Sequence, residues 1–171
     1  MVKDGGCPSS DVVRLAEFDA DSVVDLLDRY GMSLVKVARQ ADIPGSFWGE
    51  PEAGLVDNRL YARADTPVHS ILHEASHFIC MDPHRRQNLH TDAGGDYDEE
   101  NGVCYLQVLL SDQPGFMGRE RMFEDMDSWG YSFRLGGSKR WFYKDADDAL
   151  QWLIRRGLLS GDAEPCGALR L

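Results

Sequence analysis

The pattern His-Glu-x-x-His occurs once in the chain, at His73, Glu74 and His77, within a mostly apolar stretch. The apolar residues around it recur at helical spacing, Pro67 suits a first helical turn, and Pro83 ends the pattern. Residues four apart on an α-helix differ by about 40° in direction and about 6 Å in height. The spacing therefore predicts a helix that projects both imidazoles from one face, as ligands of a single metal ion.

Glu74 lies beside the two histidines and predicts a catalytic use for such a metal. A metal ion lowers the pKa of a bound water to about 7. A neighbouring carboxylate can accept the proton of that water and pass it to a leaving amine. Glu74 is therefore the candidate general base of a hydrolase.

A catalytic zinc site usually has three protein ligands and one open position, so a third ligand must come from elsewhere. The best source is an acidic run that begins a second expected helix, from about Asp98 to Leu110. Glu99 heads the apolar stripe of that helix, so its phase favours Glu99 as the inward-facing ligand. Glu100 is the alternative, on a more polar side that it shares with Cys104, Gln107 and Ser111.

Three further residues are candidates for contacts around the metal. His69 precedes His73 by one helical turn. It could contact a substrate, support a metal ligand from behind, or be an exposed histidine with no role in the site. His90 and Tyr97 are candidate substrate or supporting residues, and with Tyr131 and Arg85 they are candidate donors to a developing oxyanion. Spacing alone does not choose among them.

The composition favours one globular domain over residues 1–171, with residues 1–10 as a flexible tail. A formal net charge of −11 argues against a nucleic-acid partner, because phosphate binding needs clustered Lys and Arg. No apolar run approaches the roughly 18 residues that span a bilayer, and the first residues carry no apolar leader. We therefore expect a cytoplasmic protein with no membrane partner.

The remaining elements predict a mixed α+β fold. We expect one bent helix or two short ones within Asp19–Ala41, then a strand, turn and strand within Gly54–Arg63. A short acidic helix is expected over residues 119–128, and a hairpin over residues 131–143. A last helix begins near Asp145, with Gly157 where a C-terminal cap belongs.

An H-E-x-x-H helix followed by a second helix that starts with Glu-Glu resembles the Glu-zincins of the zincin-like metallopeptidase superfamily. The likeness is to small intracellular zincins in which the second helix runs into paired leucines. It covers about Leu60 to Leu110, and the matching residues are His73, Glu74, His77, Glu99 and Leu109-Leu110.

This resemblance implies a single zincin-like domain, in which a small twisted sheet packs against the motif helix and a second helix donates the third ligand. It implies one Zn²⁺ per chain and a peptide or protein substrate, received by strand addition at Gly54–Val56 or Arg59–Tyr61. The expected function is a zinc peptidase. Two alternatives stay open: a non-catalytic metal-binding structural or interaction module, and a zinc hydrolase of a small amide or ester.

Overall fold

The structure is a computed structural model that describes residues 2–3 and 11–171. Within these residues the chain is mixed α+β, with seven α-helices. The tail expected over residues 1–10 lies outside the described residues, apart from residues 2–3. The elements are β1 Val2–Lys3, a 3-10 turn Leu15–Glu17, α1 Ala20–Arg29, β2 Ser33–Lys36, β3 Gly54–Val56, β4 Arg59–Ala62, α2 Val68–Cys80, α3 Pro83–Gln87, α4 Tyr97–Ser111, α5 Arg119–Trp129, β5 Tyr131–Ser132, α6 Ser138–Lys144 and α7 Asp147–Arg155.

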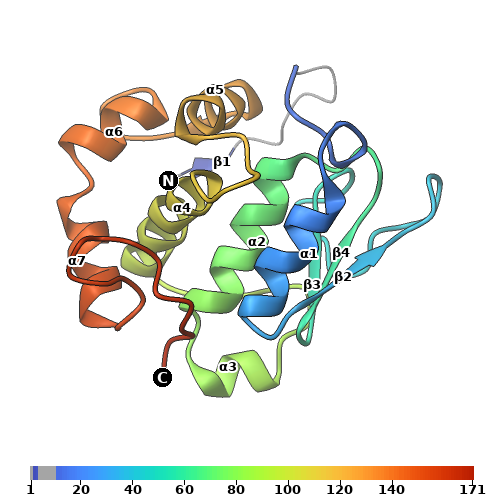
Figure 1. The fold of residues 1–171 in the computed structure, drawn as a ribbon, viewed down its shortest axis with the longest axis horizontal. Coiled ribbons are helices and arrows are strands. Elements are labelled where there is room, and N and C mark those ends of the chain that lie inside the picture. The colour runs from blue at the N-terminus through green and yellow to red at the C-terminus, as the bar shows by residue number, and fades with distance from the viewer. Residues whose placement is uncertain (1, 4–10) are drawn as a thin grey trace.

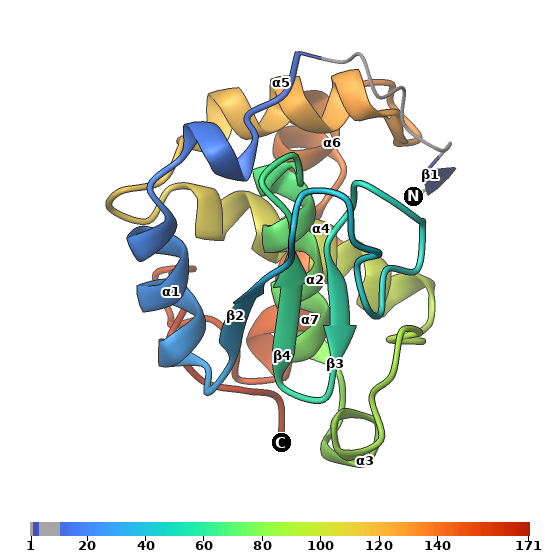
Figure 2. The same ribbon diagram turned by 90° about the vertical axis from the view of Figure 1, so that its right-hand side faces the viewer.

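The main sheet has three strands in the order β2-β4-β3, and its open face is seen in Figure 2. β3 and β4 form an antiparallel hairpin, while β2 runs parallel to β4. Asp57 begins the tight turn of this hairpin with φ of 54°, a left-handed conformation that Asp tolerates better than most residues. A second, two-stranded sheet joins β1 to β5.

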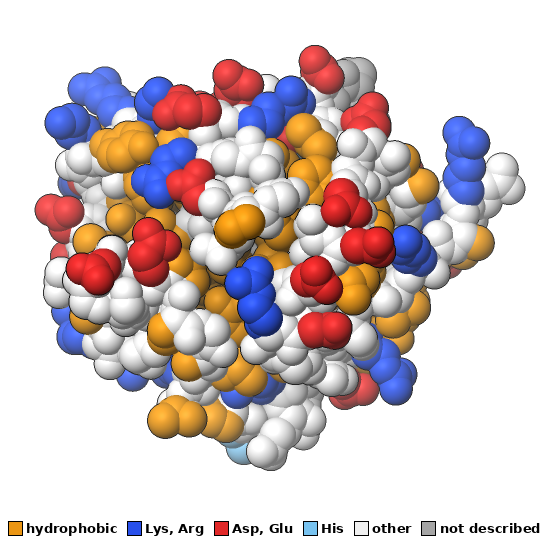
Figure 3. Space-filling view, in the orientation of Figure 1, with side chains coloured by type: hydrophobic (Ala, Val, Ile, Leu, Met, Phe, Trp, Pro, Cys, Tyr) orange, Lys and Arg blue, Asp and Glu red, His pale blue; other side chains and the backbone are white. Residues whose placement is uncertain are grey.

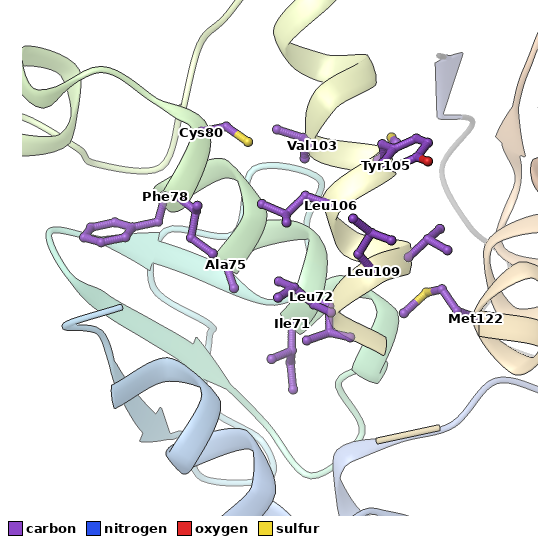
Figure 4. Packing of buried hydrophobic residues seen from close by; sticks show 14 of the residues in the cluster. Ile71, Leu72, Ala75, Phe78, Cys80, Val103, Tyr105, Leu106, Leu109 and Met122 are labelled. Carbon is purple, nitrogen blue, oxygen red and sulfur yellow. The ribbon is translucent and has the colours of Figure 1, made fainter. Parts of the chain in front are cut away.

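Helix α2 lies at the centre of the molecule, between the sheet on one side and α4 on the other (Figure 1). All of its residues, from Val68 to Cys80, are buried. Leu72 and Ala75 of α2 and Leu106 of α4 belong to one hydrophobic core, in which Ala75 points away from α4 (Figure 4). The histidine motif is therefore held on a helix whose residues are all buried, which fixes its position.

Helices α5, α6 and α7 cover the side of α4 away from the sheet (Figure 1). Tyr105 of α4 faces them and stacks on Phe142, with ring centroids 4.3 Å apart. The outer face in Figure 3 mixes acidic and basic side chains, with acidic ones gathered over α1. Among the described helices, none combines the length and apolar character that crossing a membrane requires.

Several sequence predictions are confirmed: the motif helix, the second helix from about residue 98, the β3–β4 hairpin, the acidic helix α5 and the last helix α7. Two were wrong. The second half of Asp19–Ala41 is strand β2 rather than helix, because Ser33–Lys36 pair with β4. The hairpin expected over residues 131–143 is instead strand β5 followed by helix α6, whose Trp141 stacks on Phe133 at 4.4 Å.

Candidate metal centre

The two histidines of the motif face one another across one turn of α2. Their Nε2 atoms are 3.2 Å apart, and their rings are nearly perpendicular. Both side chains are buried, so their lone pairs are held in a region with little water. Two imidazole nitrogens at this separation share either a proton or a cation.

Glu100 completes the group from helix α4. Its Oε1 lies 3.5 Å from Nε2 of His73, and its Oε2 lies 3.4 Å from Nε2 of His77. Tetrahedral zinc with bonds of about 2.0–2.1 Å separates its ligand atoms by roughly 3.3–3.4 Å. The spacing of these three side chains therefore fits one small cation, and among the described residues they are the cluster that could hold a metal ion.

Gln107 fixes the orientation of His73. The amide nitrogen of Gln107 donates to the carbonyl oxygen of His69 at 3.1 Å, so its oxygen is turned towards His73. That oxygen lies 2.9 Å from Nδ1 of His73 and can only accept, so Nδ1 carries the proton. In the neutral ring the Nε2 lone pair then points towards His77 and Glu100, which is the tautomer that a metal ligand requires.

Glu99, which helical phase favoured as the third ligand, points elsewhere. Its buried carboxylate forms ion pairs with Arg85 and Arg170, the second at 2.8 Å. The apolar stripe of α4 favoured Glu99 as the ligand. Every residue of α4 from Gly102 to Ser111 is buried, however, so an apolar stripe does not identify the side that meets α2. The polar side does, and it is the side that carries Glu100 and Gln107.

Glu74 lies at the wall of a cleft of about 480 Å³, within the range of roughly 300–1,000 Å³ that ligand sites occupy. His77 and Glu100 line the same cleft. One side of the three-residue group thus opens to the cleft, beside the carboxylate that was predicted as general base. The opposite side is closed by Gln107 and the core.

The other candidates lie outside this cleft. His69 is buried behind the site, with Nδ1 3.4 Å from the hydroxyl of Tyr131, so its place is behind a ligand rather than against a substrate. His90 is exposed and bonded to the hydroxyl of Thr91. Tyr97 is exposed beside a separate hollow next to α6. Arg85 is paired with Glu99, as described above.

The two strands named for strand addition, β3 and β4, do not offer the free edge that this binding mode needs. β4 is the central strand, with β2 on one side and β3 on the other. The outer edge of β3 is bonded to the chain after α3: the amide of Thr91 donates to Leu55 at 3.0 Å, and the amide of Asp57 donates to Leu89 at 2.9 Å. Strand addition at Gly54–Val56 or Arg59–Tyr61 is therefore not supported by the structure.

No family model, no curated protein and no solved structure matches this chain.

Sequence reasoning missed two parts of the site. Gln107 lies two helical turns after Glu100, so a polar residue at that spacing on an enclosed helix was an available signal. The aromatic pair Phe47 and Trp48 lines the cleft from the loop between β2 and β3. No periodicity marks such a loop, and only the fold brings it to the motif.

Proposed function

We propose that this chain is a zinc-dependent peptidase of the zincin type, with His73, His77 and Glu100 as metal ligands and Glu74 as general base. The observation that carries the proposal is the opening of this three-residue group onto a cleft that Glu74 also lines. Two imidazoles and one carboxylate are a donor set that suits zinc. The order of sheet, motif helix and ligand-donating helix supports the resemblance to Glu-zincins.

The open side favours catalysis over a purely structural metal site. Structural zinc is usually enclosed by four protein ligands, whereas catalytic zinc keeps a position for water or substrate. Among the described residues the metal-ligating group has three members. Cys80 and His84, which a closed site would need, are not among them.

A bound zinc ion supplies Lewis acidity, which polarises a carbonyl group and lowers the pKa of water that it contacts. Glu74 accepts a proton from the attacking water, whose oxygen forms a bond to the carbonyl carbon of the peptide. Glu74 then gives that proton to the amide nitrogen as the carbon–nitrogen bond breaks. One water is consumed, and the products are a carboxylate and an amine. Gln107 keeps the proton of His73 on Nδ1 throughout.

The test is the substitution Glu74→Gln in protein loaded with one equivalent of zinc. It removes the proton acceptor and keeps the shape, so peptide hydrolysis should fall by about 10²–10⁴-fold while zinc content is unchanged. Glu124→Gln, at an exposed position of α5, is the matched control and should hydrolyse as the wild type does. Equal hydrolysis by Glu74→Gln and wild type would contradict the general-base role.

A further inference from the structure

Two exposed aromatic side chains form one wall of the cleft. Phe47 and Trp48 are 52% and 44% exposed, and their rings meet edge to face with centroids 5.2 Å apart. Scattered apolar side chains on a surface are common and need no explanation. An adjoining aromatic pair that lines the same hollow as Glu74, His77 and Glu100 is different, because it presents apolar area where a substrate would lie.

The loop that carries this pair is anchored at its base. The amide of Leu55 donates to the carbonyl oxygen of Gly45 at 3.3 Å. Gly54 makes this close approach possible, because a Cβ atom there would lie 2.1 Å from the carbonyl oxygen of Pro44. Glu50 accepts a hydrogen bond from the amide of Ile43 and pairs with Arg63, the residue that follows β4. An aromatic surface that is already positioned loses less conformational entropy when it binds.

The facing wall is the chain after α3, residues 91–95, which Figure 2 shows on the same side of the sheet as the loop between β2 and β3. It contributes the methyl group of Ala93, the backbone of Gly94 and Gly95, and the carboxylate of Asp92. Gly95 has φ of 110°, and a Cβ atom there would lie 2.9 Å from a carboxylate oxygen of Glu99. Gly94 and Gly95 carry no side chain that could reach across the cleft towards the aromatic pair.

The charge of the cleft has one sign. Its lining includes the carboxylates of Glu74, Asp92 and Glu100, and among the described residues that line it there is no Lys or Arg. A doubly charged metal ion would offset two of these three carboxylates, which leaves the cleft negative. Such a field attracts cationic groups and disfavours acidic ones.

We propose that the cleft takes an extended peptide segment with an aromatic side chain beside the bond that is cut and a basic residue close to it in sequence. This rests on the proposed peptidase function. Because the outer edge of β3 is already bonded to Leu89 and Thr91, recognition depends on side chains more than on a main-chain ladder. Phe47 and Trp48 contact the aromatic side chain, and Asp92 attracts the basic one.

The experiment compares synthetic peptides that share an Ala-Gly-Ser background and differ at two positions, Phe or Ala and Lys or Glu. With zinc-loaded wild type, the Phe peptide should be cleaved with about tenfold higher kcat/KM than the Ala peptide, and the Lys peptide better than the Glu peptide. Phe47→Ala and Trp48→Ala should bring the Phe-to-Ala ratio towards one. Asp92→Asn should do the same for the Lys-to-Glu ratio.

Tyr143→Ala is the matched control, because Tyr143 is 50% exposed on α6 and lies away from the cleft. It should leave both ratios unchanged. Cleavage that is indifferent to both positions would overturn this inference and leave the peptidase function standing. Absence of cleavage with every peptide would count against the peptidase function.

If no peptide is cleaved, calorimetry can measure how tightly the same peptides bind to the zinc-loaded Glu74→Gln variant. This measurement then tests the proposed peptide preference. Tighter binding of the Phe and Lys peptides, lost in Trp48→Ala and Asp92→Asn, supports it. Equal binding of all four peptides overturns it.

Discussion

Glu99 and Glu100 are neighbours in the first turn of α4, yet their carboxylates lie in opposite electrostatic environments. Consecutive residues on a helix point about 100° apart, so the two side chains meet different parts of the molecule. Glu99 is enclosed by the guanidinium groups of Arg85 and Arg170. Glu100 faces the imidazoles of His73 and His77, at the edge of the cleft.

The two carboxylates differ in the source of the positive charge that balances them. Around Glu99, the positive charge comes from two arginines, and Arg170 also donates to the carbonyl oxygen of Cys80 at 3.2 Å. Around Glu100, the near neighbours are nitrogen lone pairs, so the positive charge must come from solution or from protonation. We call the first group the arginine cluster (Arg85, Glu99 and Arg170) and expect it to stabilise the fold, whereas the group around Glu100 is the one that could hold a metal ion.

The largest effect should separate the two glutamates. Glu100→Gln removes a charged ligand, so zinc affinity should fall by more than the roughly 10–100-fold typical of supporting residues, with little change in the melting temperature of the metal-free protein. Glu99→Gln leaves two guanidinium groups around a neutral amide. It should lower the free energy of unfolding by roughly 2–4 kcal/mol, because removing one partner strands buried charge. Competition with a zinc chelator and urea unfolding measure the two quantities.

The opposite pattern of effects in these two variants would contradict this assignment. A loss of zinc affinity in Glu99→Gln that exceeds the loss in Glu100→Gln would make Glu99 the ligand, as helical phase alone suggested.

Substitutions of Gln107 test whether zinc binding depends on the orientation of the His73 imidazole. Gln107→Leu removes the acceptor at 2.9 Å from Nδ1 of His73 and should weaken zinc binding by about 10–100-fold. Gln107→Glu keeps an acceptor at that position and should restore part of the affinity. If both variants bound zinc as the wild type does, the orientation of His73 would not depend on this contact.

The sequence alone predicted the motif helix but not the choice between the two glutamates. The motif helix was predictable because histidine spacing, apolar spacing and proline position all agree. The choice between Glu99 and Glu100 was open because it depends on which side of an enclosed helix meets α2, and burial of α4 on all sides removes that signal. Polar residues on a buried helix were the better guide, since each needs a partner.

The two wrong elements have a common cause. Leu34 and Val35 form a short apolar run that fits a helix or a strand, and pairing with β4 decides for the strand. Tyr131, Phe133 and Leu135 alternate with polar residues as in a strand of a hairpin. Trp141 and Phe142, however, lie on a helix and pack on Phe133 and Tyr105. In both cases contacts distant in sequence override the local pattern.

A smaller effect is expected at the arginine cluster. Arg170→Ala removes one of two cations around Glu99 and should lower the free energy of unfolding by about 1–3 kcal/mol, without a change in zinc affinity beyond about threefold. Arg156 lies over the same Trp152 ring as Arg170, at 5.3 Å against 5.4 Å. Arg156→Ala is therefore the matched control and should cost less than about 1 kcal/mol. An equal loss in both variants would mean that the ring contact, rather than Glu99, stabilises the fold.

The smallest effect concerns the thiol of Cys80, beside the arginine cluster. Burial raises the pKa of Cys80, and the carboxylate of Glu99 raises it further, so little thiolate forms at neutral pH. An alkylating reagent should label the exposed Cys166 and leave Cys80 unlabelled, with or without zinc. Arg170→Ala should increase labelling of Cys80, measured by mass spectrometry of digested protein. Labelling of Cys80 on zinc removal alone would show that the two groups are coupled.

The most direct test of the central claim is the position of zinc in a crystal of the zinc-loaded protein, from anomalous diffraction on both sides of the zinc absorption edge. The account predicts one peak per chain, within about 2.0–2.2 Å of Nε2 of His73, Nε2 of His77 and a carboxylate oxygen of Glu100, and open towards the cleft. A peak coordinated by Glu99, or the absence of a peak between the two histidines at full zinc occupancy, would contradict it.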